Sequence, residues 1–494
     1  MKNRFPLSWR CGALLFASPL LAGTVSSTSA APSKKPTVAA RKTATKVSSR
    51  PLFRTSSTRT LQMQETPAFY LRSGDRVVFY GDSITEHRYY TMFVETYVLT
   101  RFPSWQMRFF NAGWGGDKVS GAPGRPIDVR LRRDVVAHLP TVVTVMLGMN
   151  DAGWRAFDPQ LFTDFSQGYE HIADVLQTSL PRARVTLLRP SPFDDVAQAP
   201  RFPGGYNEVL QRYGDFVANL AQRRGMAVAD LNAPVVEAVT RATEADEEQA
   251  KKIMGDRAHP SSAGHLLMAM AMLRAWNAPS FVTTVDIDAV NLQAVRSVNS
   301  SVTQVRRVAT TSAKSAANAQ APGAQEDATL TWTQQDKALP FPLNRADSTT
   351  ALVLRSSDFD QVLNNQTLRV AGLRKSNYRL KINKYQIGVF SADQLLNGIN
   401  LAQFVTPMTT QAQRVYDLTD QRNRVQYAAW RQIQLPLANI ESSKYRDVLR
   451  ALGSMENELI SKQRAAAQPK PCVYELTPVA DTALPAPIFP NEAG

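Results

Sequence analysis

The stretch Arg76-Val-Val-Phe-Tyr-Gly-Asp-Ser-Ile-Thr85 decides how this 494-residue chain is interpreted. After Arg76 it begins with apolar, β-branched and aromatic residues, a pattern typical of a buried parallel strand. Beyond Thr85 the apolar residues recur at positions 89, 90, 93, 94, 97 and 98, which predicts a helix. Ser83 therefore lies at a strand-to-helix turn, where open α/β folds bind their ligands. Gly-Asp-Ser is also an ordinary turn composition, so Ser83 alone does not define a catalytic site.

Strand-like and helix-like stretches alternate on both sides of this turn. The strand-like runs are 76–80, 106–111, 141–147, 184–190 and 226–231, and the amphipathic stretches are 88–101, 128–138, 160–178, 206–224 and 262–276. This alternation predicts a five-stranded parallel sheet covered by helices on both faces. Right-handed crossovers would place every strand-to-helix turn at one edge of that sheet.

Three further motifs fall at the same predicted edge. They are Asn111-Ala-Gly-Trp-Gly-Gly-Asp117, Gly148-Met-Asn-Asp151 and Asp256-Arg-Ala-His-Pro260. Glycines let a backbone N–H approach a ligand, and an Asn side chain can donate into the same cleft. An Asp three residues before a His can fix the tautomer of the imidazole, so that its other nitrogen accepts a proton from a nucleophile. Each motif alone also fits a turn or a helix cap.

Together the motifs supply every group that serine ester hydrolysis requires. Ser83 is the candidate nucleophile, His259 the base and Asp256 the partner of the base. The candidate oxyanion donors are the backbone N–H groups of Ser83 and Gly116 and the side chain of Asn150.

These motifs resemble the sequence blocks of the SGNH/GDSL hydrolases, a family of serine esterases and lipases that includes lysophospholipase L1-like enzymes. The resemblance covers about residues 74–278. It implies a flavodoxin-like three-layer α/β/α fold, ester hydrolysis without metal or cofactor, and the same roles for the residues named above. Gly116 is preferred over Gly113 and Gly115 because it directly precedes Asp117, as the family pattern requires. The Gly-x-Ser-x-Gly pattern of α/β-hydrolases is absent around Ser83.

Three aromatic side chains are further candidates for substrate contact. His87 follows the predicted nucleophile by four residues, and Trp114 and Trp154 lie in the loops after the second and third strand-like runs. A Trp ring can stack on a sugar or line an acyl pocket, although packing in the core or at its rim is the simpler interpretation of either Trp.

Composition argues against several other classes of protein. The chain carries a formal charge of +15, but residues 1–60 hold 11 Lys and Arg and no acid. The rest is nearly balanced, so we expect no nucleic-acid partner. No apolar run beyond the N-terminus is long enough for a stable membrane anchor. The two Cys and five His form no metal-ligand pattern, and we expect no metal or cofactor.

The chain divides into segments of different composition and pattern. We interpret 1–31 as a signal peptide, 32–66 as a disordered linker, 67–280 as the catalytic domain, 281–390 as a β-rich accessory region, 391–465 as a helical region and 466–494 as a disordered tail. The β-like runs of the accessory region include 281–287, 328–332, 351–355, 367–370 and 378–382.

The sequence thus predicts an exported, periplasmic or extracellular, serine esterase with a small-molecule or polysaccharide ester as substrate. O-acyl groups of carbohydrates, acetyl above all, are the first choice, and lysophospholipids or other lipid esters are the alternative. A non-catalytic carbohydrate-binding or cell-envelope protein is the alternative from another class. The sequence does not predict the oligomeric state.

Overall fold

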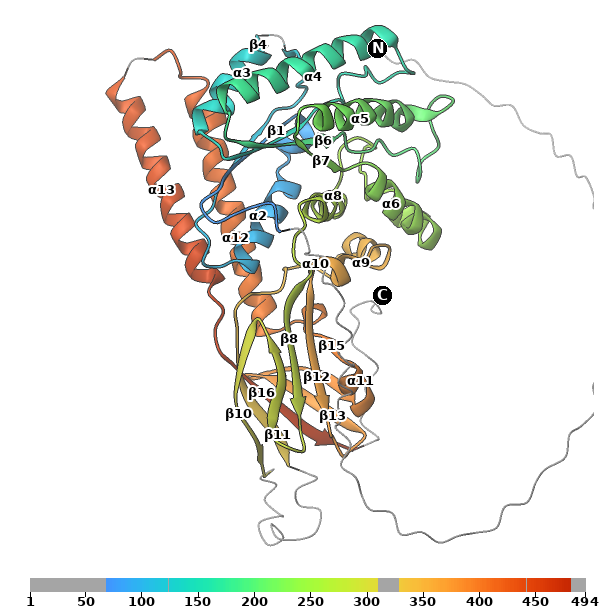
Figure 1. Cartoon of the computed structure of the whole chain (residues 1–494), viewed down its shortest axis with the longest axis vertical. Helices are drawn as coiled ribbons and strands as arrows, with labels where there is room; N and C mark the ends of the chain where they lie inside the picture. The colour runs from blue at the N-terminus through green and yellow to red at the C-terminus, as the bar shows by residue number, and fades with distance from the viewer. Residues whose placement is uncertain (1–67, 123, 310–327, 441, 481–494) are drawn as a thin grey trace, which may run out of the picture. The chain divides into compact units, whose positions relative to one another are not determined.

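The computed structural model describes residues 68–122, 124–309, 328–440 and 442–480 (Figure 1). The predicted signal peptide and linker lie outside these residues. Five strands form a parallel sheet in the order β2-β1-β5-β6-β7. They are β1 (Arg76–Gly81), β2 (Arg108–Gly113), β5 (Val142–Met146), β6 (Arg184–Arg189) and β7 (Ala227–Asp230). This is the strand order of flavodoxin-like folds, and it reverses direction between β1 and β5.

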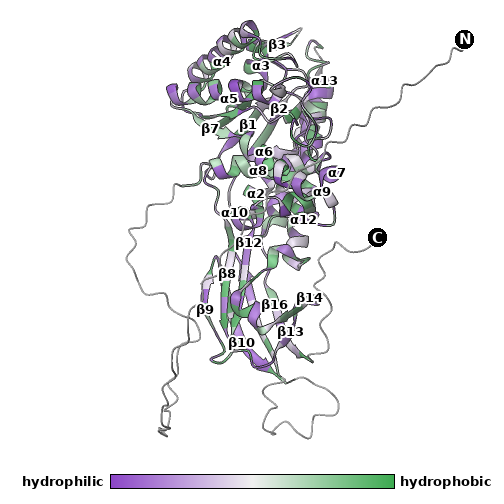
Figure 2. Cartoon of the chain, turned by 90° about the vertical axis from the view of Figure 1, so that its right-hand side faces the viewer, coloured by the Kyte–Doolittle hydropathy of each residue, from purple (hydrophilic) through white to green (hydrophobic). Residues whose placement is uncertain are grey.

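Helices cover both faces of this sheet (Figure 1). On one face α2 (Tyr89–Arg101) packs against α8 (Ser262–Ala275), with α6 (Ala233–Ala245) beside α8; on the other lie α3 (Ile127–Asp134), α4 (Pro159–Ser179) and α5 (Gly205–Arg223). In α4 the buried residues Phe165, Tyr169, Ile172 and Leu176 recur at helical spacing, and hydrophilic residues lie between them along the α4 ribbon in Figure 2. The predicted three-layer α/β/α fold is confirmed.

Short elements connect these layers. They are α1 (Ser83–Glu86), β3 (Gly121–Ala122), β4 (Arg125–Pro126), η1 (Val136–His138) and α7 (Glu247–Ala250). In the described part of the chain, no helix combines the length and the apolar character needed to cross a membrane.

Beyond residue 280 two further sheets share a second apolar core. One contains, in order, β10 (Ser300–Val308), β11 (Thr329–Asp336), β16 (Cys472–Val479), β13 (Asn377–Ile382) and β14 (Tyr385–Ser391); the other contains β15 (Ile399–Asn400), β12 (Asn365–Ala371), β8 (Phe281–Asp288) and β9 (Gln293–Val298). Val285, Trp332, Leu380 and Tyr474 are among the side chains of this core. The C-terminal β-rich extension that we expected is therefore present.

Two expectations for this extension are wrong. The sequence predicts a disordered tail at 466–494, yet β16 pairs antiparallel with β11 on one side and with β13 on the other. Cys472, Tyr474 and Leu476 alternate into the core, a short period-two pattern that the surrounding Pro and Ala residues obscure. The sequence also predicts a β-like run at 351–355, but these residues belong to helix α9 (Ser348–Arg355). Asp347 caps the N-terminus of this helix, because its side chain accepts from Thr350 N (2.7 Å).

The last helices return to the catalytic sheet. The extension also contains α10 (Phe359–Leu363), α11 (Ala392–Asn397), η2 (Leu401–Gln403), α12 (Pro407–Tyr427), the π-helical turn η3 (Ala428–Gln434) and α13 (Ser443–Ala467). Gln426 of α12 accepts from Asn111 N (3.2 Å) and donates to Phe109 O (3.1 Å), and Arg422 donates to the same oxygen (2.9 Å). These side chains satisfy backbone groups that the edge strand β2 would otherwise expose.

Candidate active site

Ser83 is the first residue of α1, two residues after the end of β1 at Gly81. Asp82 caps this helix because its side chain accepts from Ile84 N (3.0 Å). Only glycine fits at the end of the strand, since a Cβ on Gly81 would lie 2.2 Å from Thr85 Oγ1 and 2.8 Å from Met146 O. The turn therefore brings Ser83 to the carboxyl edge of the sheet at the point where the strand order reverses.

Ser83, His259 and Asp256 form a continuous hydrogen-bonded chain. Ser83 Oγ lies 2.8 Å from His259 Nε2, and His259 Nδ1 lies 2.9 Å from Asp256 Oδ2. The other carboxylate oxygen accepts from Ala258 N (3.1 Å) and His259 N (2.8 Å). If Nδ1 donates to the carboxylate, Nε2 is left to accept the proton of Ser83.

Asp256 is suited to remain ionised in this chain. Its partial burial on its own would raise the pKa of the carboxyl. The hydrogen bonds from the His259 ring and from the backbone N–H groups of His259 and Ala258 outweigh burial and hold the pKa below its usual value. A carboxylate at this position can orient the imidazole and stabilise its protonated form.

The candidate oxyanion donors lie around one turn. Gly116 has a φ of +77°, a conformation that favours glycine, and a Cβ on Gly115 would lie 3.8 Å from Ser83 Cβ. Asn150 follows β5, and its Nδ2 donates to Asp117 O (3.1 Å), which leaves its second amide hydrogen available. The Gly115–Gly116 turn is thus packed against Ser83, and the Asn150 amide against the same turn.

Three buried carboxyl groups support the loops of the site. Burial raises the pKa of Asp82 to about 7 and the pKa of Asp151 to about 6, although each accepts a backbone hydrogen bond. Asp151 Oδ1 accepts from Val119 N (2.8 Å). Burial also raises the pKa of Asp117, whose Oδ2 accepts from Arg130 Nε at 2.7 Å.

Asp82 is expected to make stability depend on pH. Its folded pKa lies above the value of 3.8 that it has when exposed, so the native state binds more protons than the unfolded chain between about pH 4 and 7. The stabilising contribution of this group is present at low pH and is lost as pH rises through its folded pKa. Asp82→Asn should therefore lose less free energy of unfolding than the wild type between pH 5 and 8, as measured by urea denaturation. If the free energy of unfolding fell equally with pH in the wild type and in Asp82→Asn, the raised pKa of Asp82 would be contradicted.

Gly255 is expected to control the placement of the candidate base. It has a φ of +53°, and an added Cβ would lie 2.7 Å from His259 O. Gly255→Ala should displace His259 and lower kcat for p-nitrophenyl acetate by about 10²-fold. Gly225→Ala is the matched control, because its φ is +63° but nothing lies within 4 Å of the added Cβ. Equal kcat values in the two variants would contradict this role of Gly255.

The three aromatic candidates occupy different surroundings. His87 is exposed, and its ring centre lies 5.1 Å from that of His259. Trp154 is 45% exposed and stacks on Tyr206 at 5.3 Å. Trp114 is half-buried and already has the guanidinium carbon of Arg431 3.4 Å from its ring centre. Their contact with substrate stays a prediction.

Sequence reasoning missed two residues beside the site. Glu86 ends α1, and its Oε2 accepts from Gly115 N (2.7 Å). Arg431 of η3 donates from Nη2 to the other oxygen of Glu86 (2.9 Å). The position of Glu86, three residues after Ser83, could have drawn attention to it. The sequence around Arg431 does not indicate its contact with Glu86, because Glu86 lies 345 positions earlier.

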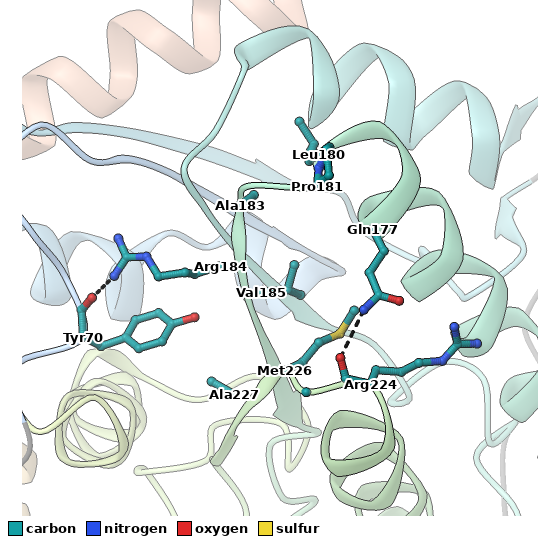
Figure 3. A pocket seen from close by; sticks show the side chains of 11 residues that line it. Tyr70, Gln177, Leu180, Pro181, Ala183, Arg184, Val185, Arg224, Met226 and Ala227 are labelled. Atoms are coloured by element: carbon teal, nitrogen blue, oxygen red, sulfur yellow. Dashed lines mark hydrogen bonds between the residues drawn. The ribbon is translucent and has the colours of Figure 1, made fainter.

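A separate cavity lies at the opposite edge of the sheet, where β6 and β7 begin (Figure 3). Arg184 in its lining donates to Tyr70 O and Asp75, and Gln177 Nε2 donates to Arg224 O (3.1 Å). Its polar groups are thus paired with protein, and we assign it no part in the chemistry. Among residues 68–480, apart from those left undescribed, no group of three or more His, Cys, Asp or Glu side chains could hold a metal ion.

Comparisons with known proteins identify relatives of this fold. Residues 79–267 match the GDSL-like Lipase/Acylhydrolase family. An acetylxylan esterase from Geobacillus stearothermophilus is 27% identical over 222 residues, which are 41% of this chain and 94% of that enzyme. The solved structure of BT4096, described as a gut microbial diltiazem-metabolizing enzyme, superposes with a TM-score of 0.70 at 25% identity, over 83% of this chain and 99% of its own.

The fold and these matches define an ester-bond hydrolase. Residues 79–267 belong to the GDSL-like lipase/acylhydrolase family, within the SGNH/GDSL hydrolases. The alternative of a non-catalytic binding protein is therefore not retained. The match to BT4096 extends well beyond residues 79–267, so the similarity in fold includes much of the extension.

Proposed function

We propose that this protein is an exported serine esterase that removes O-acyl groups, acetyl in the first place, from carbohydrates. The observation that carries the catalytic part is the chain from Ser83 Oγ through His259 to Asp256, with distances of 2.8 and 2.9 Å. The similarity to an acetylxylan esterase supports the substrate class. Export rests on residues 1–31, and the N-terminal sequence of the mature protein would test it.

In the proposed reaction His259 Nε2 takes the proton of Ser83 Oγ as that oxygen attacks the ester carbonyl carbon. The oxyanion accepts hydrogen bonds from Ser83 N, Gly116 N and Asn150 Nδ2, each contributing on the order of 3 kcal/mol to transition-state stabilisation. Protonated His259 then gives its proton to the leaving alkoxide, and the alcohol departs. Water deprotonated by His259 attacks the acyl-enzyme, releases the acid and restores Ser83.

Trp154 supports a substrate that contains a ring. Its side chain is 45% exposed, lies four residues after Asn150, and has Tyr206 and Phe193 behind it at ring distances of 5.3 and 6.0 Å. A rigid, exposed indole backed by aromatic side chains is a suitable surface for stacking a sugar or an aromatic ring. Because BT4096 is described as metabolising diltiazem, diltiazem is a second candidate substrate.

A substrate panel tests this proposal. Wild type and Ser83→Ala would be assayed on p-nitrophenyl esters from C2 to C12, acetylated xylan, acetylated pectin, diltiazem and a lysophospholipid. We expect acetate release from an acetylated polysaccharide, a preference for the shortest acyl chain, and no turnover by Ser83→Ala. A preference for C8 to C12 esters or for the lysophospholipid would replace the carbohydrate by a lipid, and activity in Ser83→Ala would overturn the catalytic assignment.

A further inference from the structure

The C-terminal extension reaches the candidate oxyanion turn through one arginine. Arg431 lies in the π-helical turn η3 that continues α12, and its side chain is 16% exposed. Its Nη2 donates to Glu86 Oε1 at 2.9 Å, and its guanidinium carbon lies 3.4 Å from the centre of the Trp114 ring. Arg431 thus contacts both the helix that begins with Ser83 and the loop that contains Gly116.

Glu86 joins these two parts of the site. Its Oε2 accepts from Gly115 N at 2.7 Å, while Oε1 accepts from Arg431 and, at 3.4 Å, from the hydroxyl of Tyr427. The carboxylate therefore connects three segments that are distant in the sequence: α1, the oxyanion turn and η3. A hydrogen bond to an ionised acceptor is shorter and stronger than one between neutral groups.

The contacts around Gly115 leave the turn little room to move. A Cβ on Gly115 would lie 3.0 Å from Glu86 Oε2 and 3.8 Å from Ser83 Cβ. Trp114, one residue earlier, lies against Arg431 and packs edge-on to Trp430 at 5.8 Å. With the Gly115 N–H held by Glu86, the next N–H along the turn is that of Gly116.

We propose that Arg431 is a positioning residue of the esterase. Through Glu86 it holds the Gly115–Gly116 turn in the orientation in which Gly116 N donates to the developing oxyanion. The proposal rests on the oxyanion role proposed for Gly116. Donors aimed at charge that develops in the transition state accelerate reaction because they need no reorganisation, so a side chain that fixes their direction acts on kcat.

Kinetics separate this role from a merely structural one. A contact that only stabilises the fold changes the amount of folded enzyme, whereas loss of a transition-state interaction lowers kcat and kcat/KM together and leaves KM nearly unchanged. Arg431→Gln should lower kcat for p-nitrophenyl acetate, per folded molecule, by about 10-fold or more, since removal of a whole oxyanion donor costs about 10²–10³-fold. Arg431→Lys should recover part of the loss, because Lys keeps the charge opposite Glu86 but cannot stack its guanidinium plane on Trp114.

Arg424→Gln is the matched control. Arg424 lies on α12, is 73% exposed and pairs with Asp420 (2.7 Å), so its removal should leave kcat unchanged. Glu86→Gln should lower kcat at least as much as Arg431→Gln, and the double variant should be no slower than Glu86→Gln alone, because both residues act through the same turn. Folded fractions would be measured by circular dichroism for every variant.

The inference would be overturned if Arg431→Gln kept the wild-type kcat, or if its loss of activity only followed its folded fraction. It would also be overturned if the losses of the two single variants multiplied in the Glu86→Gln/Arg431→Gln double variant. Ser83→Ala, assayed on the same ester, separates this outcome from failure of the proposed function. If Ser83→Ala is inactive while Arg431→Gln is fully active, the inference alone fails. If Ser83→Ala remains active, the catalytic assignment on which the inference rests fails with it.

Discussion

Replacing His259 with Ala is expected to lower kcat for p-nitrophenyl acetate by about 10⁶-fold, the size of effect known for the Ser and His of the subtilisin triad. His259 Nε2 lies 2.8 Å from Ser83 Oγ, so its loss leaves the hydroxyl without a base and the departing alcohol without an acid. Ser83→Ala should be equally inactive, and the double variant no worse than either single one, because the two side chains act as a unit. Asp256→Ala should cost less, about 10⁴-fold.

His171→Ala is the control for this experiment. His171 is also paired with an aspartate, Asp128, at 2.7 Å, but both side chains are about half exposed and belong to α4 and α3. Its replacement should leave kcat unchanged. If the losses in Ser83→Ala and His259→Ala multiplied in the double variant, the two residues would act independently, and the hydrogen-bonded chain would not be the catalytic unit.

The catalytic sheet could be predicted because neighbouring residues in the sequence specify each of its strands and turns. Each strand is a short apolar run followed by turn residues, and parallel strands place their carboxyl ends at one edge. That rule was sufficient to relate Ser83, Asn150 and His259, although 176 positions separate the first from the last. Each of these three residues belongs to a recognisable turn motif.

The extension could not be predicted in the same way, because its pairings are not local. β16 lies between β11 and β13, and its partner Trp332 precedes Tyr474 by more than a hundred residues. Gln426 satisfies the backbone of β2 from a helix that periodicity alone would present as an ordinary amphipathic one. Polar side chains that will be buried against a distant strand have the same sequence pattern as side chains exposed to water. The contacts of Arg422, Gln426 and Arg431 with the catalytic domain could therefore not be predicted.

Glu95→Ala is expected to lower the free energy of unfolding by about 3–5 kcal/mol, the usual cost of removing one member of a buried ion pair. Glu95 of α2 and Arg422 of α12 have side chains 4% and 2% exposed, and they are joined at 3.0 and 2.7 Å. Glu95 also accepts from Asn423 (3.2 Å) and from Gln463 of α13 (3.1 Å). Its removal takes one acceptor from each of these donors and leaves the buried guanidinium of Arg422 with Glu456 as its remaining carboxylate partner. Equilibrium denaturation in urea would measure the change.

The same pair tests whether the extension and the catalytic domain unfold together. Glu237→Ala, which removes an exposed glutamate paired with Arg241 on α6, should leave the free energy of unfolding nearly unchanged. Replacing Glu95 with Leu and Arg422 with Met at once should recover much of the loss, because the buried guanidinium is removed as well and Glu456, its other partner, is 26% exposed. If Glu95→Ala splits one transition into two, the domains are separately stable. If a single transition moves to lower urea, then α2, α12 and α13 form one cooperative unit, and the helices that brace the oxyanion turn fold only with the sheet that carries Ser83.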